Sequence, residues 1–366
     1  MQMSIGVDLH KGQFTVYWKS EDGMNDRWAK YQTTEDGYRS FLSELRITCE
    51  RYECEVAVES TGNTRYFKQR VESAGVAVRV INTLKFKVVN ESVKKTDRHD
   101  AATIAEFLEK DMLPESQLCS PESEELRRLL KTRKILVQSA VKIKNQLHGL
   151  LMGFGIEISK GSLQSKKSRR AVKIVLAEHN LPDEVVDPLI ETIEKIEEQV
   201  KELEKLLEKK VADDRYVELI RSIPGAGLIT AATIRAYTDD IKRFRTYKQY
   251  SAYAGLVPWV QNSNTRERVG NITKRGPEEL RTALVQLVLG MVRNKRTTCS
   301  YRIMMKYDRM KPHKGSGKSI IAAARKLSKI IWYMLQNDQP FDSAKMTDPT
   351  IRKAAQEMSL AAIQAA

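Results

Sequence analysis

Cysteine and histidine are scarce in this sequence of 366 residues, and their spacing does not suggest a metal site. The 4 cysteines include no C-x-x-C pair, which argues against a zinc site and a disulfide framework and fits a reducing cytoplasm. The 5 histidines are scattered without the spacing of metal ligands. We therefore expect neither zinc-based nor haem-based chemistry.

Long apolar runs are also missing. No uninterrupted run is long enough to cross a bilayer, and the first residues, MQMSIGVDLH, lack the basic and apolar segments of a secretory signal. We expect a cytoplasmic protein with no membrane partner. With 41% apolar residues the chain should be globular, and its length exceeds what one hydrophobic core usually supports, so two or three domains are expected.

Basic residues outnumber acidic ones. The chain has 62 Lys and Arg against 47 Asp and Glu, which gives a net charge of +15 at pH 7. Such an excess attracts polyanions, and nucleic acid is the commonest such partner. An acidic membrane surface and plain solubility are the alternatives.

The first hundred residues alternate between strand and helix signals. Strands are expected near SIGVDLH, QFTVYWKS, RWAKYQTT, CEVAVES and VAVRVINT. Helices are expected after the third strand, from the cap Thr34 to about Cys49, and after the fourth. This order of three strands, helix, strand, helix and strand predicts an RNase H-like α/β domain over residues 1–112.

Heptad patterns dominate residues 113–213, which we interpret as a coiled-coil or helical linker. Ser120 and Pro121 signal a helix start, and apolar residues then recur at three- and four-residue steps from Leu126 to Leu150. After a Gly- and Lys/Arg-rich interruption, a second seam runs from Leu189 to Leu207. The two helices can pair within one chain or between subunits.

Two aspartates in KTDRHDA, Asp97 and Asp100, share one face of a predicted helix because they lie three residues apart. They could simply cap that helix. However, Asp8 lies in the first apolar strand and Glu59 ends the fourth, and these strands are neighbours in an RNase H-like sheet. We therefore predict that the four carboxylates converge and hold Mg²⁺, with Mn²⁺ as an alternative. Nearby cations that would offset phosphate charge are Lys11, Lys95 and Arg98.

The remainder, residues 214–345, should be mainly helical, followed by a tail over residues 346–366. SIPGAGLITAATIRA contains a tight turn at Gly225 and Gly227, which predicts either a helix-hairpin-helix that binds a nucleic-acid backbone or an ordinary helix–helix turn. HKGSGKS is expected to be a glycine loop before a helix at Ile320, since it departs from the P-loop pattern.

A polar loop is expected between Pro258 and Gly276, with an isolated serine, Ser263. No neighbouring histidine supplies a base, so this serine could act as a nucleophile only if a metal site elsewhere activated it. Four cations that could contact a nucleic acid follow the serine: Arg266, Arg268, Lys274 and Arg275.

These motifs resemble those of the bacterial DEDD-type insertion-sequence transposases, which are related to the Piv DNA invertases and include bridge-RNA-guided recombinases. The resemblance rests on GVDLHK, VAVES and KTDRHDA, and on IPGAGLITAATI, YAGLVP, GNITKRG, LRTALVQ and ARKL. It implies a RuvC-like N-terminal domain, a coiled coil and a C-terminal transposase domain. Asp8, Glu59, Asp97 and Asp100 match the family's DEDD tetrad, and Ser263 matches its nucleophilic serine. The family usually has Ser-Ser-Gly-Gly where this chain reads NSNT.

The resemblance also implies a reaction and its partners. The DEDD residues would hold Mg²⁺, and the serine would form a covalent phosphoserine link that conserves bond energy for rejoining DNA. A structured guide RNA would pair with donor and target double-stranded DNA, and dimers would assemble into tetramers near the bacterial nucleoid. Three alternatives are a DNA invertase without guide RNA, a RuvC-like junction endonuclease that uses water, and a non-catalytic nucleic-acid scaffold.

Overall fold

A computed structural model of the chain describes residues 1–89, 96–159, 161–178, 183–263 and 266–350. Contacts within the chain separate it into two units, Met1–Cys119 and Ser120–Ala366. The first unit extends beyond residue 112 because Glu115 forms a β-bridge with Ile81, and because Arg65 donates a hydrogen bond to the carbonyl of Cys119.

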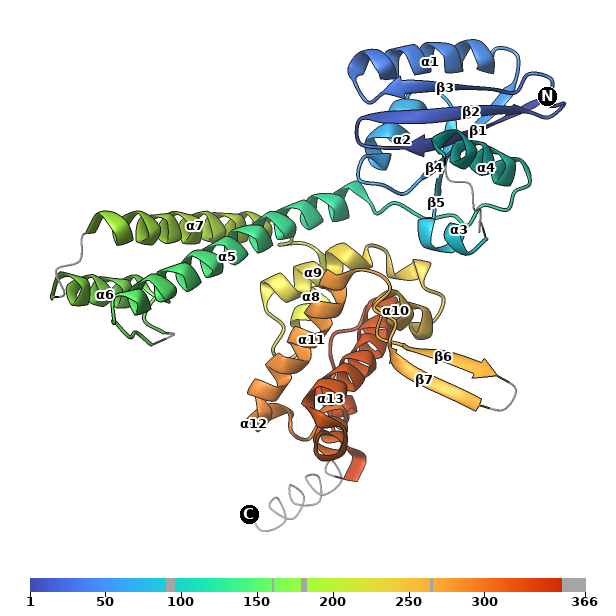
Figure 1. Cartoon of the computed structure of the whole chain (residues 1–366). Coiled ribbons are helices and arrows are strands. Elements are labelled where there is room, and N and C mark those ends of the chain that lie inside the picture. Colours follow the sequence, from blue (N-terminus) through green and yellow to red (C-terminus); the bar gives the residue numbers. More distant parts are fainter. Residues whose placement is uncertain (90–95, 160, 179–182, 264–265, 351–366) are drawn as a thin grey trace. The chain divides into compact units, whose positions relative to one another are not determined.

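A mixed five-stranded sheet forms the centre of the first unit (Figure 1). Its strands are β1 (Gln2–Leu9), β2 (Gln13–Ser20), β3 (Arg27–Gln32), β4 (Glu53–Glu59) and β5 (Ala77–Ile81), in the spatial order β3-β2-β1-β4-β5. Neighbouring strands are antiparallel from β1 to β3, whereas β4 and β5 run parallel to β1. The predicted order of strands and helices is confirmed, including the start of α1 (Glu35–Cys49), where Thr34 accepts a hydrogen bond from the amide of Gly37.

Alternation along the strands gives the sheet two different faces. Ile5 and Val7 of β1 and Val56 and Val58 of β4 pack in one core with α1 and α2 (Thr64–Glu72). The intervening residues face the other way. There Ala57 of β4 packs in a second cluster with Ile104 and Leu108 of α4 (Asp97–Glu109), near α3 (Thr83–Val89). Figure 1 shows α4 lying across the sheet on this side.

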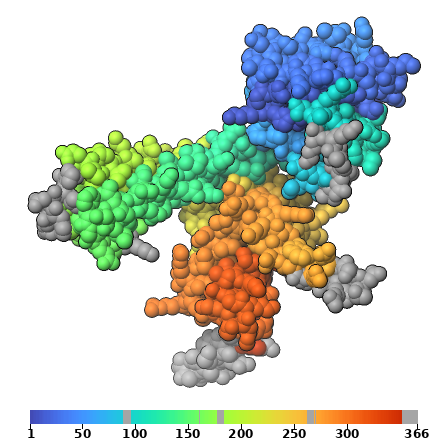
Figure 2. All heavy atoms as spheres, viewed as in Figure 1, coloured from blue at the N-terminus to red at the C-terminus, as the bar shows by residue number. Residues whose placement is uncertain are grey.

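Two long helices open the second unit and run antiparallel to each other. They are α5 (Pro121–Gly153) and α7 (Asp183–Lys210), and ion pairs connect Arg133 with Glu204 and Lys144 with Glu197. From the first ion pair to the second, the residue number increases on α5 and decreases on α7, as expected for an antiparallel pair. Figure 2 draws all atoms as spheres and shows α5 and α7 packed against each other, and apolar side chains of both helices belong to one buried cluster. The heptad seams therefore pair within one chain, and pairing between subunits stays a prediction.

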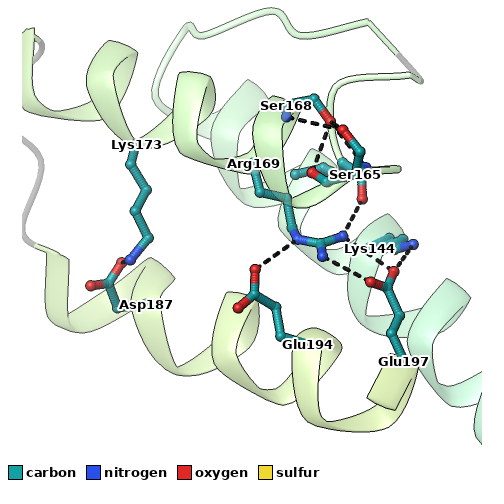
Figure 3. A network of polar contacts seen from close by, with 9 residues as sticks. Lys144, Ser165, Ser168, Arg169, Lys173, Asp187, Glu194 and Glu197 are labelled. Carbon is teal, nitrogen blue, oxygen red and sulfur yellow. Dashed lines mark hydrogen bonds and ion pairs between the residues drawn. The ribbon is translucent and has the colours of Figure 1, made fainter. Parts of the chain in front are cut away.

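The predicted interruption between the seams is partly helical, because α6 (Lys166–Glu178) begins within it. Figure 3 shows the polar contacts that connect α6 to α7. The side chain of Arg169 is 1% exposed and lies 2.8 Å from Glu197 and 3.4 Å from Glu194 of α7. It also donates a hydrogen bond to the carbonyl of Leu163, so the cation is satisfied on several sides.

Short helices and one long helix build the rest of the second unit around a single apolar core. They are α8 (Arg215–Arg221), α9 (Leu228–Thr238), the 3₁₀ turn η1 (Ile241–Arg243), α10 (Tyr247–Tyr253), α11 (Glu278–Arg293), α12 (Lys295–Thr298), α13 (Arg302–Gln336) and α14 (Ser343–Met346). The break expected in HKGSGKS is present, although it is shorter than a loop. α13 consists of two helical segments that meet at a kink at Gly315, where φ is 74° and ψ is 163°. The second segment folds back toward the first, because the Lys326 ammonium reaches the carbonyl of Arg302.

A β-hairpin stands where the sequence predicted an irregular polar loop. Strands β6 (Pro258–Ser263) and β7 (Arg266–Ile272) pair antiparallel. Trp259 lies so close over Gly270 that a methyl group on this glycine would fall 2.5 Å from Cζ2 of the indole ring and closer still to Cε2 and Nε1. The missing side chain therefore makes room for the cross-strand tryptophan. In the part of the chain that the structure describes, no helix has both the length and the apolar character needed to cross a bilayer.

Candidate metal and nucleic-acid sites

Asp8 and Glu59 occupy equivalent places on neighbouring parallel strands. Val7 of β1 is in register with Val58 of β4, and each acid is the next residue along its strand. Both therefore lie at the carboxyl end of the sheet. The alternation of the strands turns them away from the α1 and α2 core, toward the face that α4 covers.

Helix α4 reaches this face because small residues let it approach closely. Gly6 and Ala57 are in register on the sheet, and Ala101 and Ala105 are fully buried on the helix. A methyl group on Gly6 would lie 2.5 Å from the backbone nitrogen of Ala105 and closer still to the carbonyl oxygen of Ala101. This contact fixes the first turn of α4, which carries Asp97 and Asp100, beside the end of β1.

Capping does not explain the aspartate pair. The N-cap of α4 is Thr96, whose hydroxyl accepts a hydrogen bond of 3.2 Å from the amide of His99. The alternative in which Asp97 is the capping residue is therefore wrong. Its carboxylate instead accepts hydrogen bonds from the Gln13 amide at 3.3 Å and the Lys30 ammonium at 3.2 Å.

His10 joins the acids. Its Nε2 lies 3.0 Å from an oxygen of Asp8 and 3.8 Å from an oxygen of Asp97. One donor atom from each of these three residues lies within 4.8 Å of the other two. Ligands of an octahedral ion with bonds of about 2.1 Å are about 3.0 Å apart when cis and about 4.2 Å apart when trans. The distances from His10 to Asp8 and Asp97, 3.0 and 3.8 Å, lie within that range.

The electrostatics connect all four predicted carboxylates. Burial raises the pKa of Asp8, and the neighbouring charges of Asp100 and Asp97 raise it further against the opposing effect of His10. Burial likewise raises the pKa of Glu59, with added repulsion from Asp8 and Asp100. By contrast, the hydrogen bond from Lys30 lowers the pKa of Asp97.

This donor set fits a divalent cation. Crowded, partly buried carboxylates repel one another, and a bound cation removes that repulsion. Carboxylate oxygens suit hard ions such as Mg²⁺, and an imidazole nitrogen adds affinity for Mn²⁺ and later transition metals.

The sequence missed three members of this cluster: His10, Gln13 and Lys30. His10 follows Asp8 by two residues, so strand alternation was an available signal for it. Gln13 and Lys30 reach the site through the antiparallel pairing of β1, β2 and β3, in which Gln13 is in register with Gln32 and Thr15 with Lys30. No spacing rule in the sequence gives that register.

The predicted phosphate-binding cations near the acids have different surroundings. Lys11 is exposed at the turn between β1 and β2. The guanidinium of Arg98 lies 5.3 Å from the centre of the Trp28 ring, a cation–π contact. Lys95 lies outside the described residues.

Ser263 is the last residue of β6, and its backbone is in register with that of Arg266 in β7. The side chains of these two residues lie outside the described part of the structure. Arg268, Lys274 and Arg275 are exposed on β7 and the segment after it, so they are accessible to an anion.

Gly225 and Gly227 form the turn between α8 and α9. Gly225 has a φ of 87°, and a methyl group there would lie 3.0 Å from the backbone of Gly290 in α11. Packing against α11 therefore accounts for Gly225. Gly227 is the N-cap of α9 and has open space around its Cα, so a role in backbone binding stays a prediction for this turn.

Comparison with known proteins identifies families that this chain resembles. A transposase family model of the DEDD type matches residues 5–156, which include all four acids, and a model described as "Transposase IS116/IS110/IS902 family" matches residues 217–302. The DEDD match implies dependence on a divalent metal ion.

Curated relatives match over nearly the whole chain. A probable family 20 transposase of Pseudomonas aeruginosa is 26% identical over 91% of this chain and 97% of its own. The transposase for insertion sequence element IS1111A of Coxiella burnetii is 27% identical, with 92% of this chain and 90% of its own covered. The pilin gene-inverting protein of Moraxella bovis is 23% identical, over 92% and 97%.

Proposed function

Because the chain belongs to the IS110/IS116 family of transposases, enzymes that act on DNA, we propose that it cuts and rejoins DNA through a covalent phosphoserine link. The observation that supports this proposal is the cluster of Asp8, His10 and Asp97, whose donor atoms lie within 4.8 Å of one another. Glu59 and Asp100 are not part of that group of three, but their charges act on the same carboxyls. The order β3-β2-β1-β4-β5 supports an RNase H-like, RuvC-like fold for this domain.

The four acids would hold Mg²⁺, or Mn²⁺ in its place, and His10 would supply an additional donor. Such an ion, when bound, polarises a phosphoryl oxygen and stabilises the oxygen that leaves. The protein's own part is to orient the donors. The close contact of α4 with Gly6 fixes Asp97 and Asp100, and Gln13 and Lys30 restrain the Asp97 carboxylate.

Ser263 is the nucleophile. Its Oγ forms a bond to phosphorus as the bond from phosphorus to the departing strand end breaks. The serine proton passes to solvent water, and the freed strand end takes up one proton from solvent, so no net proton is consumed. Later attack by a second strand end reverses the exchange, so the DNA is rejoined and the serine restored.

The partners are double-stranded donor and target DNA and a structured guide RNA, bound by dimers that assemble into tetramers. Exposed cations on the hairpin and just after it, Arg268, Lys274 and Arg275, support binding of the nucleic-acid backbone. The corresponding domains are residues 1–112 for the acids, 113–213 for the paired helices and 214–345 for the hairpin. A second candidate is inversion of a DNA segment without guide RNA, which the pilin gene-inverting relative of Moraxella bovis favours.

The decisive experiment detects the covalent link. Protein is incubated with Mg²⁺ and end-labelled DNA carrying the ends of its own element, and adducts are separated under denaturing conditions. We expect an adduct with wild-type protein and with the control Ser343→Ala, and none with Ser263→Ala or Asp97→Asn. Strand cleavage that survives Ser263→Ala would replace the serine by water and indicate a junction endonuclease.

Absence of any adduct from wild-type protein on that DNA would refute the serine mechanism. Sequencing of RNA that purifies with the protein separates the guided transposase from the invertase. A specific RNA transcribed from the element supports the guided reaction, and DNA inversion by RNA-free protein supports the second candidate.

A further inference from the structure

A concave basic surface lies between α10 and α13, away from the predicted serine hairpin in the sequence. It encloses a cavity of about 330 Å³. We call it the α10–α13 groove, and its lining includes one aromatic ring and five cations: Tyr247, Lys248, Lys306, Arg325, Lys326 and Lys329. Arg325 and Lys326 belong to the ARKL motif, whereas the other lining residues match none of the sequence motifs and come from separate helical turns.

The cations of the groove lack acidic partners. Within the described residues, none of the five lies at ion-pair distance from a carboxylate, and the ammonium of Lys326 reaches only the carbonyl of Arg302, at 3.4 Å. Elsewhere on α13 a charged side chain does have a partner of opposite charge, since Asp308 forms an ion pair with Lys295 at 2.9 Å. The groove is therefore a local excess of positive charge, and ordinary surface pairing does not balance it.

Mutual repulsion within this cluster affects its half-buried member. Burial lowers the pKa of Lys326, and the charges of Arg302, Lys306, Arg309 and Lys329 lower it further. Like charges held together around a hollow are unfavourable without a counter-charge. A polyanion laid in the groove would supply that charge at several points at once.

Buried and aromatic contacts join the two walls of the groove. A buried hydrogen bond of 2.8 Å between Ser251 and Ser328 joins α10 to α13. On the same wall, the ammonium of Lys329 lies 4.5 Å from the centre of the Tyr247 ring and 5.7 Å from that of Tyr333. Tyr333 is 45% exposed, so it offers a face to a ribose or a base.

We propose that the α10–α13 groove binds the phosphodiester backbone of a nucleic acid, with Lys306, Arg325 and Lys329 contacting successive phosphates. This inference rests on the proposed function, because it assigns a second contact surface to the same nucleic-acid complex. Several adjacent cations around one hollow suit a chain of phosphates better than a single anion.

The test measures binding without catalysis. Fluorescence anisotropy in EDTA is recorded over a salt series for a short DNA duplex and, separately, for a short RNA hairpin. We compare the double variant Lys306→Gln with Lys329→Gln against a control of equal charge, Lys205→Gln with Lys209→Gln, whose sites are exposed on α7. The groove variant should reduce the slope of log affinity against log salt by about 1 to 2 for the polymer that occupies the groove.

A second variant separates charge from folding. Replacement of Lys306 and Lys329 by arginine keeps both charges and should restore the slope. The groove binds DNA if only the duplex responds, and RNA if only the hairpin responds. Equal slopes for the groove variant and the control with both polymers would overturn the proposal. Because EDTA removes the metal, failure of the phosphoserine reaction would leave this result unaffected.

Discussion

Substitution of Gly6 by alanine tests whether the close contact between α4 and β1 positions the metal ligands. The added methyl group would lie 2.5 Å from the Ala105 nitrogen, whereas carbon and nitrogen atoms in ordinary contact are about 3.5 Å apart. The helix must therefore retreat by about 1 Å, since its contacting atoms are backbone and cannot rotate away.

Two effects of different size follow from this retreat. Overpacking of this kind lowers the free energy of unfolding by about 1–3 kcal/mol. A displacement of about 1 Å at a catalytic group can reduce a rate about 100-fold. Asp97 and Asp100 move with the helix, whereas Asp8 and Glu59 stay with the sheet. We therefore expect Gly6→Ala to fold, to bind the divalent ion more weakly and to lose about 99% of strand cleavage.

The assay combines urea unfolding, Mn²⁺ binding and cleavage of the element's DNA. Gly12→Ala is the matched control, because a methyl group there has no neighbour within 4 Å. Metal affinity and cleavage in Gly6→Ala equal to those of Gly12→Ala would refute the claim that this contact positions the acids. If Gly6→Ala fails to fold, Gly6→Ser should fail to fold as well, because serine adds a larger side chain at the same close contact.

Three further perturbations address other groups. Glu59→Gln should raise the thermal midpoint of metal-free protein at neutral pH, because burial and repulsion raise the pKa of Glu59 and disfavour its charge in the fold. His10→Asn should remove the nitrogen coupling from the electron-spin-echo spectrum of bound Mn²⁺ and weaken Mn²⁺ binding roughly tenfold. Arg169→Met should lower the free energy of local opening of α6, measured by amide hydrogen exchange, by about 2 kcal/mol. Lys173→Met should lower the same free energy by less than about 1 kcal/mol.

The controls follow from the same contacts. The gain from Glu59→Gln must disappear below the ordinary carboxyl pKa of 4.5, where both folded and unfolded chains are protonated; persistence there would contradict an ionisation effect. His313→Asn should keep the nitrogen coupling, and a coupling that survives in His10→Asn would exclude His10 as a ligand. Equal exchange in the Arg169 and Lys173 variants would show that the buried arginine adds no stability beyond a surface pair.

Much of the first unit is predictable from sequence because its signals are local and agree with one another. The apolar strand that contains Asp8, the strand that ends in Glu59 and the capped start of α1 each follow from a few neighbouring residues. Parallel pairing of β1 and β4 then places the two acids side by side at the carboxyl ends of these strands. The place of α4 was harder to predict, because it depends on Gly6 and on alanines far along the chain.

The misses have a common physical cause, which is pairing between residues that no local pattern connects. Lys30 reaches Asp97 because β3 lies in the same sheet as β1, with β2 between them, and no local sequence pattern predicts this arrangement. The β6–β7 hairpin was predicted as a loop because its polar residues hide the strand alternation. The contact of Trp259 with Gly270 identifies the pairing only once both strands are placed.

Two clusters of charge in this chain show how stability and function differ in their demands. Around Glu197, burial acts to raise the pKa, but hydrogen bonds from Arg169 and Lys144 outweigh it and lower the pKa. That cluster stabilises the fold as it stands. Around Asp8 and Glu59, burial and repulsion between acids prevail, and the pKa of each carboxyl is raised. A fold gains no stability by gathering unbalanced acids beneath α4, so their convergence is best explained by a cation that the fold is built to receive.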